Sequence, residues 1–395
     1  MLPLSPTNPA LLVFPTLLAW ITAALLVRFA GGDPTPARRY ASLDGLRGFL
    51  SLGVFFGHSV VWYYFSRTQR WDAPSSLYGY LAQYSVVMFF MLTGFLFSIK
   101  LLGARKKGRM NWLDLYISRI TRLFPLYLFA VFMVLLIALV LGDFVIRDSA
   151  WKLALNITRW LLFSISGAPN FNQIQDTWII IAGVTWSLAY EWLFYASLPF
   201  GALFFGLKPS MKSLASSSIL CLIIIFTIPQ LNPLYIIVFA VGAIAAIVSK
   251  SPRACNIFSG PLGSLLALVS IIGAVAIFPG KISPASIALA GLCFTIIACG
   301  NTLFGILTWP SVRMLGDISY SVYLIHGIVL FIAFTTIGKY SNAMYFSVIQ
   351  HWLFISILTV ILVGLSYLTY RFIEWPAMRS TPQIQARIRA ALSSL

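Results

Sequence analysis

Few side chains in this sequence can do acid–base chemistry, because its 395 residues include only three histidines and ten acidic residues. At about 100° per residue, one helical stripe carries four polar residues: Asp44, Arg47, Ser51 and His58. A histidine titrates near neutrality and commonly acts as a general base, whereas a structural histidine only hydrogen-bonds to a neighbouring helix. Both roles fit His58, and we predict that it is the catalytic base.

Glu191 is one of only two glutamates, and it lies in the polar and aromatic segment Thr185–Trp192. A carboxylate in a hydrocarbon core costs on the order of 3 kcal/mol, so it needs a partner there. We expect Glu191 at a depth similar to that of His58, where a Glu–His pair would orient the imidazole and stabilise its protonated form. Pairing with an arginine for packing is the alternative.

Arg119 and Arg122 are three residues apart, so they share one face at the start of an apolar run. Guanidinium groups bind phosphate oxygens in a bidentate manner, which predicts a phosphate clamp. The alternative is plain anchoring of the helix at the membrane surface by positive charge.

Ser319, Tyr323 and His326 recur at helical spacing on one face of a later apolar run. Hydroxyl groups in that pattern favour hydrogen bonding between membrane helices. His326 is either structural or a second catalytic or acceptor-binding group. We assign substrate contacts to Asp44, Tyr323 and His326.

Membrane helices must position these residues, because 59% of the residues are hydrophobic and 9% are charged, against roughly 25% charged in soluble domains. Several apolar runs reach the roughly 20 residues that cross a bilayer core as a helix. We predict an all-α, polytopic protein with about eleven spans, near 10–30, 44–65, 80–102, 121–142, 186–206, 215–229, 233–249, 262–279, 285–303, 316–337 and 347–371.

The longest connection, 143–185, holds Trp151 and Trp160 among basic residues, which suits a helix lying in the membrane interface as a lid or platform. When the connections between the spans are placed on alternate sides of the membrane, 20 of the 27 lysines and arginines fall on one side. The other side has seven: Arg67, Arg70, Arg147, Lys152, Arg159, Lys281 and Lys339. The positive-inside rule makes the richer side cytoplasmic. The N-terminus is then outside and the C-terminus inside.

Two other classes of function are disfavoured by the sequence. The net charge of +17 comes from basic residues between apolar runs and not from a continuous stripe with stacking aromatics, so we expect no nucleic-acid partner. The four cysteines lack CxxC spacing and are expected to be small buried hydrophobic residues, with no metal site: Cys221, Cys255, Cys293 and Cys299.

Six stretches, in this order, resemble the membrane acyltransferase-3 family, which includes bacterial glycan O-acetylases. They are Leu43-Asp44-Gly45-Leu46-Arg47-Gly48 followed by His58; Met88-Phe89-Phe90-Met91-Leu92-Thr93-Gly94-Phe95; Arg119-Ile120-Thr121-Arg122 with Pro125; Thr185-Trp186-Ser187-Leu188 with Glu191; Ser319-Tyr320-Ser321-Val322-Tyr323-Leu324 with His326; and Ile373-Glu374-Trp375-Pro376. The family's usual Leu-Ser-Gly-Phe appears here with Thr93 in place of serine.

The resemblance implies a ten-helix core at 40–378. The N-terminal helix, expected with a cytoplasmic linker at 1–39, is an addition to the family pattern, and a short cytoplasmic tail is expected at 379–395. It also implies an acyl-coenzyme A donor, used as a substrate and not bound permanently. His58 matches the family's essential histidine. Arg47, Arg119 and Arg122 match positions that handle the donor's phosphates.

From this resemblance we expect an O-acetyltransferase in a bacterial inner membrane, surrounded by lipids, that acylates a hydroxyl of a sugar or lipid-linked glycan. An O-antigen or another surface polysaccharide would be such an acceptor, and a glycolipid, peptidoglycan or a small molecule is also compatible. The alternatives are a proton-coupled transporter, in which His58 and Glu191 would carry protons, and a membrane scaffold. A transporter does not account for the paired arginines.

Overall fold

The computed structural model describes residues 5–29, 40–72, 74, 76–278, 282–337 and 346–393. Within these ranges the regular elements are helices, apart from one isolated bridge between Phe171 and Ile174, which confirms the all-α fold. The predicted linker 30–39 with Arg38 and Arg39 lies outside the described residues, as do Lys281 and Lys339.

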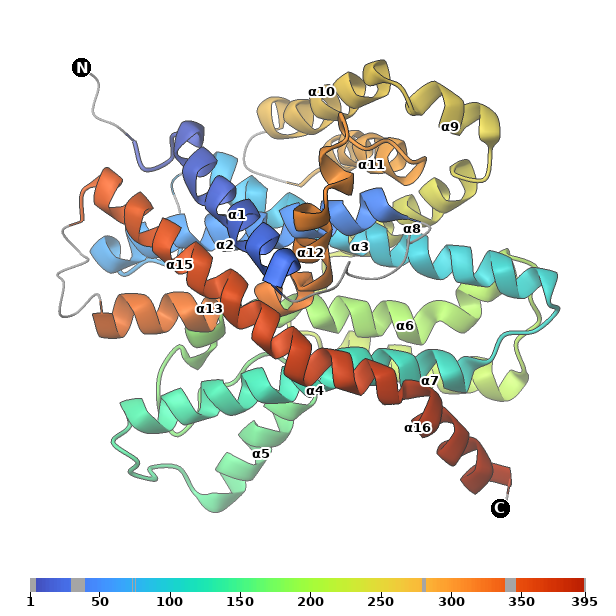
Figure 1. Ribbon diagram of the computed structural model, residues 1–395. Coiled ribbons are helices and arrows are strands. Elements are labelled where there is room, and N and C mark those ends of the chain that lie inside the picture. The colour runs from blue at the N-terminus through green and yellow to red at the C-terminus, as the bar shows by residue number, and fades with distance from the viewer. Residues whose placement is uncertain are drawn as a thin grey trace. The chain divides into compact units, whose positions relative to one another are not determined.

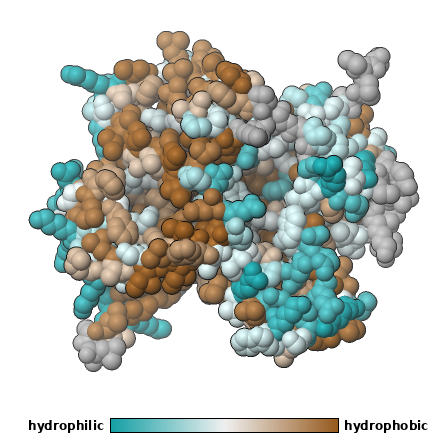
Figure 2. Space-filling view, turned by 180° about the vertical axis from the view of Figure 1, so that it is seen from behind, coloured by the Kyte–Doolittle hydropathy of each residue, from teal (hydrophilic) through white to brown (hydrophobic). Residues whose placement is uncertain are grey.

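Six helices in the described part of the chain are long and apolar enough to cross a membrane: Pro9–Phe29, Ala41–Thr68, Leu77–Lys106, Trp112–Leu141, Ser319–Thr336 and Val348–Leu392. Three shorter apolar helices lie at Met211–Thr227, Pro261–Ile277 and Pro284–Ala298. Hydrophobic residues also cover broad areas of the surface in Figure 2. The chain is therefore an integral membrane protein. Each of the eleven expected helices has a counterpart, but the number of crossings stays a prediction.

The helices divide into two units by their packing. The first unit, which includes the chain up to Ile99 and Asn232–Gly364, contains α1 (Val13–Phe29), α2 (Ala41–Thr68), most of α3 (Ser76–Lys106), α8 (Pro233–Val248), α9 (Pro252–Phe258), α10 (Pro261–Ile277), α11 (Pro284–Ala298), α12 (Pro310–Asp317), α13 (Ser319–Ile332) and most of α15 (Val348–Thr369). The second, Lys100–Leu231 and Leu365–Leu395, contains α4 (Trp112–Leu141), α5 (Ala150–Leu161), α6 (Trp186–Phe204), α7 (Met211–Thr227) and α16 (Trp375–Ser393). The predicted domain limits at 39 and 378 stay a prediction.

In the first unit, α2 is packed against α12, α13 and the short helix η3 (Ile306–Thr308), with α1 lying along α12 (Figure 1). Glycines permit this close approach. A Cβ atom on Gly316 would overlap the carbonyl oxygen of Asp44, and one on Gly45 would overlap the carbonyl oxygen of Leu307. The Gly45 position of the Asp44-Gly45-Leu46-Arg47 stretch therefore lets helices touch backbone to backbone.

Of two expected helices, the one at 233–249 is found as α8 and ends in a bend, whereas the one at 316–337 is broken. The chain bends by 103° between α8 and α9, where Ser251 caps the new helix and Pro252 occupies its first position. The span expected at 316–337 is divided into α12 and α13 at Ile318, whose ψ of 5° leaves the helical region, and continues as a π-helical turn, Ala333–Ile337. The polar face of Ser319, Tyr323 and His326 accordingly belongs to α13 alone.

In the second unit, α4 contacts α5 and α16, and α6 is packed along α7 around Leu193, Ala196 and Ile224. The helix expected between 143 and 185 is α5. Its Trp151 is 78% exposed, whereas its Trp160 is fully buried and its carbonyl oxygen accepts a 2.6 Å hydrogen bond from the Tyr127 hydroxyl of α4.

Candidate active site

His58 lies on the most buried stretch of α2. Of the residues from Leu50 to Val60, which the structure describes without a gap, His58 alone keeps an intermediate exposure while its neighbours are buried. His58 is thus partly exposed in a stretch of helix whose other residues are covered.

A second histidine holds the ring of His58. The Nδ1 atom of His58 lies 2.9 Å from the Nε2 atom of His326 on α13, and the two rings are inclined by only 21°. The Nδ1 atom of His326 lies 3.1 Å from the backbone carbonyl oxygen of Val322, one helical turn earlier. His326 is fully buried, so its ring has a fixed setting between these two partners.

The direction of these hydrogen bonds follows from the last acceptor. A carbonyl oxygen can only accept, so Nδ1 of His326 carries the proton and donates it to Val322. In a neutral His326 ring, Nε2 is then an acceptor, and Nδ1 of His58 must donate to it. This arrangement leaves Nε2 of His58 as the basic nitrogen, held in place by a chain of two hydrogen bonds.

Aromatic rings complete the surroundings of the histidine pair. Tyr323 is buried, with its ring centroid 6.3 Å from that of His326 and 6.0 Å from that of Phe89. Phe55 approaches the His326 ring edge to face at 6.4 Å. The predicted substrate residues Tyr323 and His326 are thus neighbours of His58.

The other predicted polar residues of α2 are near its start. Arg47 and Asp44 form an ion pair of 3.5 Å, with their side chains 13% and 15% exposed. Asp44 and His58 are fourteen residues apart, which is about 21 Å along a helix. Ser51, which shares their stripe, is fully buried and donates to the carbonyl oxygen of Gly48, so it adds no accessible polar group between them.

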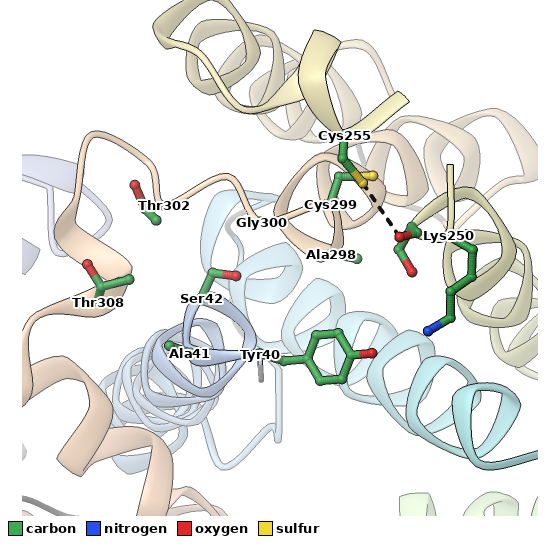
Figure 3. Close-up of a pocket in the computed structure, with 11 residues that line it drawn as sticks. Tyr40, Ala41, Ser42, Lys250, Cys255, Ala298, Cys299, Gly300, Thr302 and Thr308 are labelled. Atoms are coloured by element: carbon green, nitrogen blue, oxygen red, sulfur yellow. Dashed lines mark hydrogen bonds between the residues drawn. The ribbon is translucent and has the colours of Figure 1, made fainter. Parts of the chain in front are cut away.

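A cavity of about 520 Å³ opens where α2 begins. Its wall includes the first residues of α2, Lys250 at the end of α8, and the end of α11 (Figure 3). The thiol of Cys255 donates a 3.6 Å hydrogen bond to the carbonyl oxygen of Ser249, and the thiol of Cys299 lies beside that of Cys255. Hydroxyl groups and one lysine make this a polar cavity.

In the second unit, Arg119 of α4 interacts with Glu191 and with the hydroxyl of Tyr195 on α6. Tyr195 donates a 2.9 Å hydrogen bond to Oε2 of Glu191, and its backbone carbonyl accepts from Tyr116. Glu191 therefore has the arginine partner that the sequence allowed as one of two possibilities. Its predicted pairing with His58 stays a prediction, because the two residues belong to different units.

The basic residues of this unit form a group. Arg119 lies close enough to Arg122 and Lys100 for their charges to repel, and the Nη1 atom of Arg122 lies 3.5 Å from the sulfur of Met378 on α16. Like charges held together stabilise a bound anion, because the anion relieves their repulsion. This arrangement suits the predicted phosphate clamp.

Sequence reasoning found His58 and His326 but did not pair them. The helical spacing of Ser319, Tyr323 and His326 already indicated one functional face. The sequence does not show the depth of α13 relative to α2, so the contact between the two histidines could not be predicted. Tyr195 was missed as well, although it lies four residues after Glu191 and so on the same helical face. No group of three histidine, cysteine or acidic side chains gathers among the described residues.

A family model described as an acyltransferase domain, that of the acyltransferase-3 family, matches residues 40–371. No curated protein and no solved structure matches the chain. The matched range covers most of the chain and includes all the residues that were predicted to form the site.

Proposed function

The chain belongs to the acyltransferase-3 family, and on that basis we propose that it transfers an acetyl group from acetyl-coenzyme A to a hydroxyl of a glycan or lipid-linked sugar. The observation that carries this proposal is the setting of His58: a partly exposed histidine on a buried helix, with Nδ1 engaged by His326 and Nε2 left as a base. That is the arrangement a general base needs.

The reaction is an ester exchange. Nε2 of His58 removes the proton of the acceptor hydroxyl, whose oxygen attacks the thioester carbonyl. The C–S bond breaks, and the departing thiolate receives this proton from Nε2. In the other possible order, Nε2 attacks the thioester carbonyl, the C–S bond breaks and coenzyme A departs as its thiolate. The acceptor oxygen then attacks the acetyl-imidazole, the C–N bond breaks, and the hydroxyl proton goes to the thiolate. Both orders use the same nitrogen.

The donor's phosphates are assigned to the basic group of Arg119, Arg122 and Lys100. The assignment of Arg47 to the donor stays a prediction. The mutual repulsion of the clustered cations supports this assignment. In this proposal Glu191 positions Arg119 through the Tyr195 network. The basic side is cytoplasmic by the positive-inside rule.

The test is transfer of labelled acetyl from acetyl-coenzyme A by the protein in nanodiscs. Wild type should consume the thioester and label a glycan acceptor, and His58→Ala should abolish both while still binding the donor. Full activity in His58→Ala would refute the role of His58. Flux of a polar solute without thioester consumption would instead support the transporter.

A further inference from the structure

An aromatic side chain borders the partly exposed histidine. The ring centroid of Trp71 lies 6.3 Å from that of His58, and the two rings are inclined by 31°. Trp71 is half-buried. Trp71 follows the end of α2 and is not part of a helix.

The chain must fold back for this contact to form. Helix α2 ends at Thr68, about 15 Å beyond His58 at 1.5 Å per residue. Gln69 then adopts a left-handed conformation with φ of 57°, which reverses the chain direction. The indole of Trp71 consequently lies along α2 and reaches towards His58.

Other aromatic rings fix the indole in this place. Trp71 meets Trp62 and Phe65 edge to face, at 5.4 and 5.3 Å between ring centroids. Trp62 is itself buried and stacks flat on Phe334 at 5.4 Å. A ring supported in this way offers a preorganised surface, which lowers the entropic cost of binding a ligand.

The residues on both sides of Trp71 add polar groups at the same place. Arg70 and Asp72 are 78% and 59% exposed in their side chains and form an ion pair of 3.4 Å. A rigid aromatic ring flanked by an accessible guanidinium and carboxylate suits a sugar, because the C–H groups of a pyranose face lie on the electron-rich ring face and its hydroxyls accept and donate hydrogen bonds at the edge. A fatty alcohol would gain nothing from these charges.

We propose that Trp71 is a specificity-determining residue: it supports a pyranose ring of the acceptor and so presents one edge hydroxyl to Nε2 of His58. This proposal rests on the acyl transfer proposed above and names its acceptor class. The Arg70–Asp72 pair binds other hydroxyls of the same sugar.

The test compares two kinds of acceptor with the protein in nanodiscs and acetyl-coenzyme A as donor. Methyl pyranosides of glucose, galactose, rhamnose and N-acetylglucosamine have the flat C–H face, whereas the open-chain alditol sorbitol offers similar hydroxyls without it. We expect wild type to prefer at least one pyranoside. Trp71→Ala should lower the ratio of kcat/KM for that pyranoside over sorbitol at least tenfold, mainly through KM, and Trp71→Phe should restore most of the ratio.

The control is Trp151→Ala, which removes an exposed tryptophan on α5 and should leave the ratio within twofold of wild type. The proposal would be overturned if Trp71→Ala left the ratio of kcat/KM values unchanged, whether kcat/KM stayed at the wild-type value or fell equally for both acceptors. Wild type that acetylates sorbitol but no pyranoside would overturn this proposal alone. Wild type that consumes no thioester with any acceptor would overturn the proposed acyl transfer itself.

Discussion

The Nδ1 atom of His58 donates to the Nε2 atom of His326 across 2.9 Å, and His326 in turn donates to a backbone carbonyl. This pairing orients the predicted base through a second histidine. A neutral imidazole stabilises a neighbouring imidazolium less than a carboxylate does, so the geometry of the pair is its main contribution.

His326→Ala should lower kcat roughly 100-fold, because a freely rotating base loses its alignment with the acceptor hydroxyl. KM for both substrates should change little. Initial rates of thioester consumption in nanodiscs measure both constants. His351→Gln is the control, because His351 is equally buried but lies outside the pair, and it should keep kcat within a few-fold of wild type. Wild-type kcat in His326→Ala would mean that the pair only supports the fold.

Arg119→Gln should raise the KM for acetyl-coenzyme A about tenfold and leave the KM for S-acetyl-pantetheine unchanged, since the second donor lacks the phosphates. Competition between the two donors measures this selectivity. Arg387→Gln, on the exposed side of α16, is the control. An equal rise in KM for both donors would show that Arg119 acts only through the packing of Tyr195 and Glu191.

Gly316→Ala should destabilise the protein by about 1–3 kcal/mol, because the added methyl group meets the Asp44 carbonyl and α2 must move away from α12. Thermal unfolding in detergent, followed by tryptophan fluorescence, should show a lower midpoint. Gly364→Ala is a matched control, because its Cβ would meet no atom within 4 Å. Equal midpoints for the two variants would contradict the tight contact.

The loop before α5 should make stability depend on pH. The hydrogen bond from Lys152, 2.8 Å from Oδ1 of Asp148, lowers the pKa of that carboxyl below its ordinary value. A lowered pKa in the folded state stabilises the protein above the unfolded-state pKa near 4, and this stabilisation disappears as pH falls through the folded-state pKa. Lys152→Ala should therefore lower the unfolding midpoint at pH 7 but not at pH 2. Lys212→Ala, on exposed α7, is the control, and a difference that persists unchanged at pH 2 would refute the linkage.

Much of this architecture could be predicted from hydropathy, because long apolar runs have few folded alternatives in a bilayer. The break at Ile318 could not, since Leu315-Gly316-Asp317-Ile318 reads as the start of a single helix. Gly316, two residues before the break, closely approaches a backbone 272 residues earlier in the chain, and local propensity does not encode such a contact.

The residues of the candidate site could be proposed from their types, but the contacts between them could not. His58 and Glu191 were identifiable because ionisable groups in apolar runs are rare and costly. Their partners depend on the relative depth and rotation of separate helices, which no single sequence displays. Trp71 gave no signal at all, because a tryptophan just after a membrane helix is the usual interface anchor.

The hydrogen-bond chain from His58 through His326 stops at the carbonyl oxygen of Val322, which cannot take a proton and pass it on. A membrane protein with buried imidazoles risks becoming a leak for the ion gradient across its bilayer. Here the chain of hydrogen bonds ends at a group that cannot pass a proton on, so it gives a proton at Nε2 no path into the protein. In the proposed transfer, the proton that Nε2 takes from the acceptor therefore leaves with the thiolate and not through these two histidines.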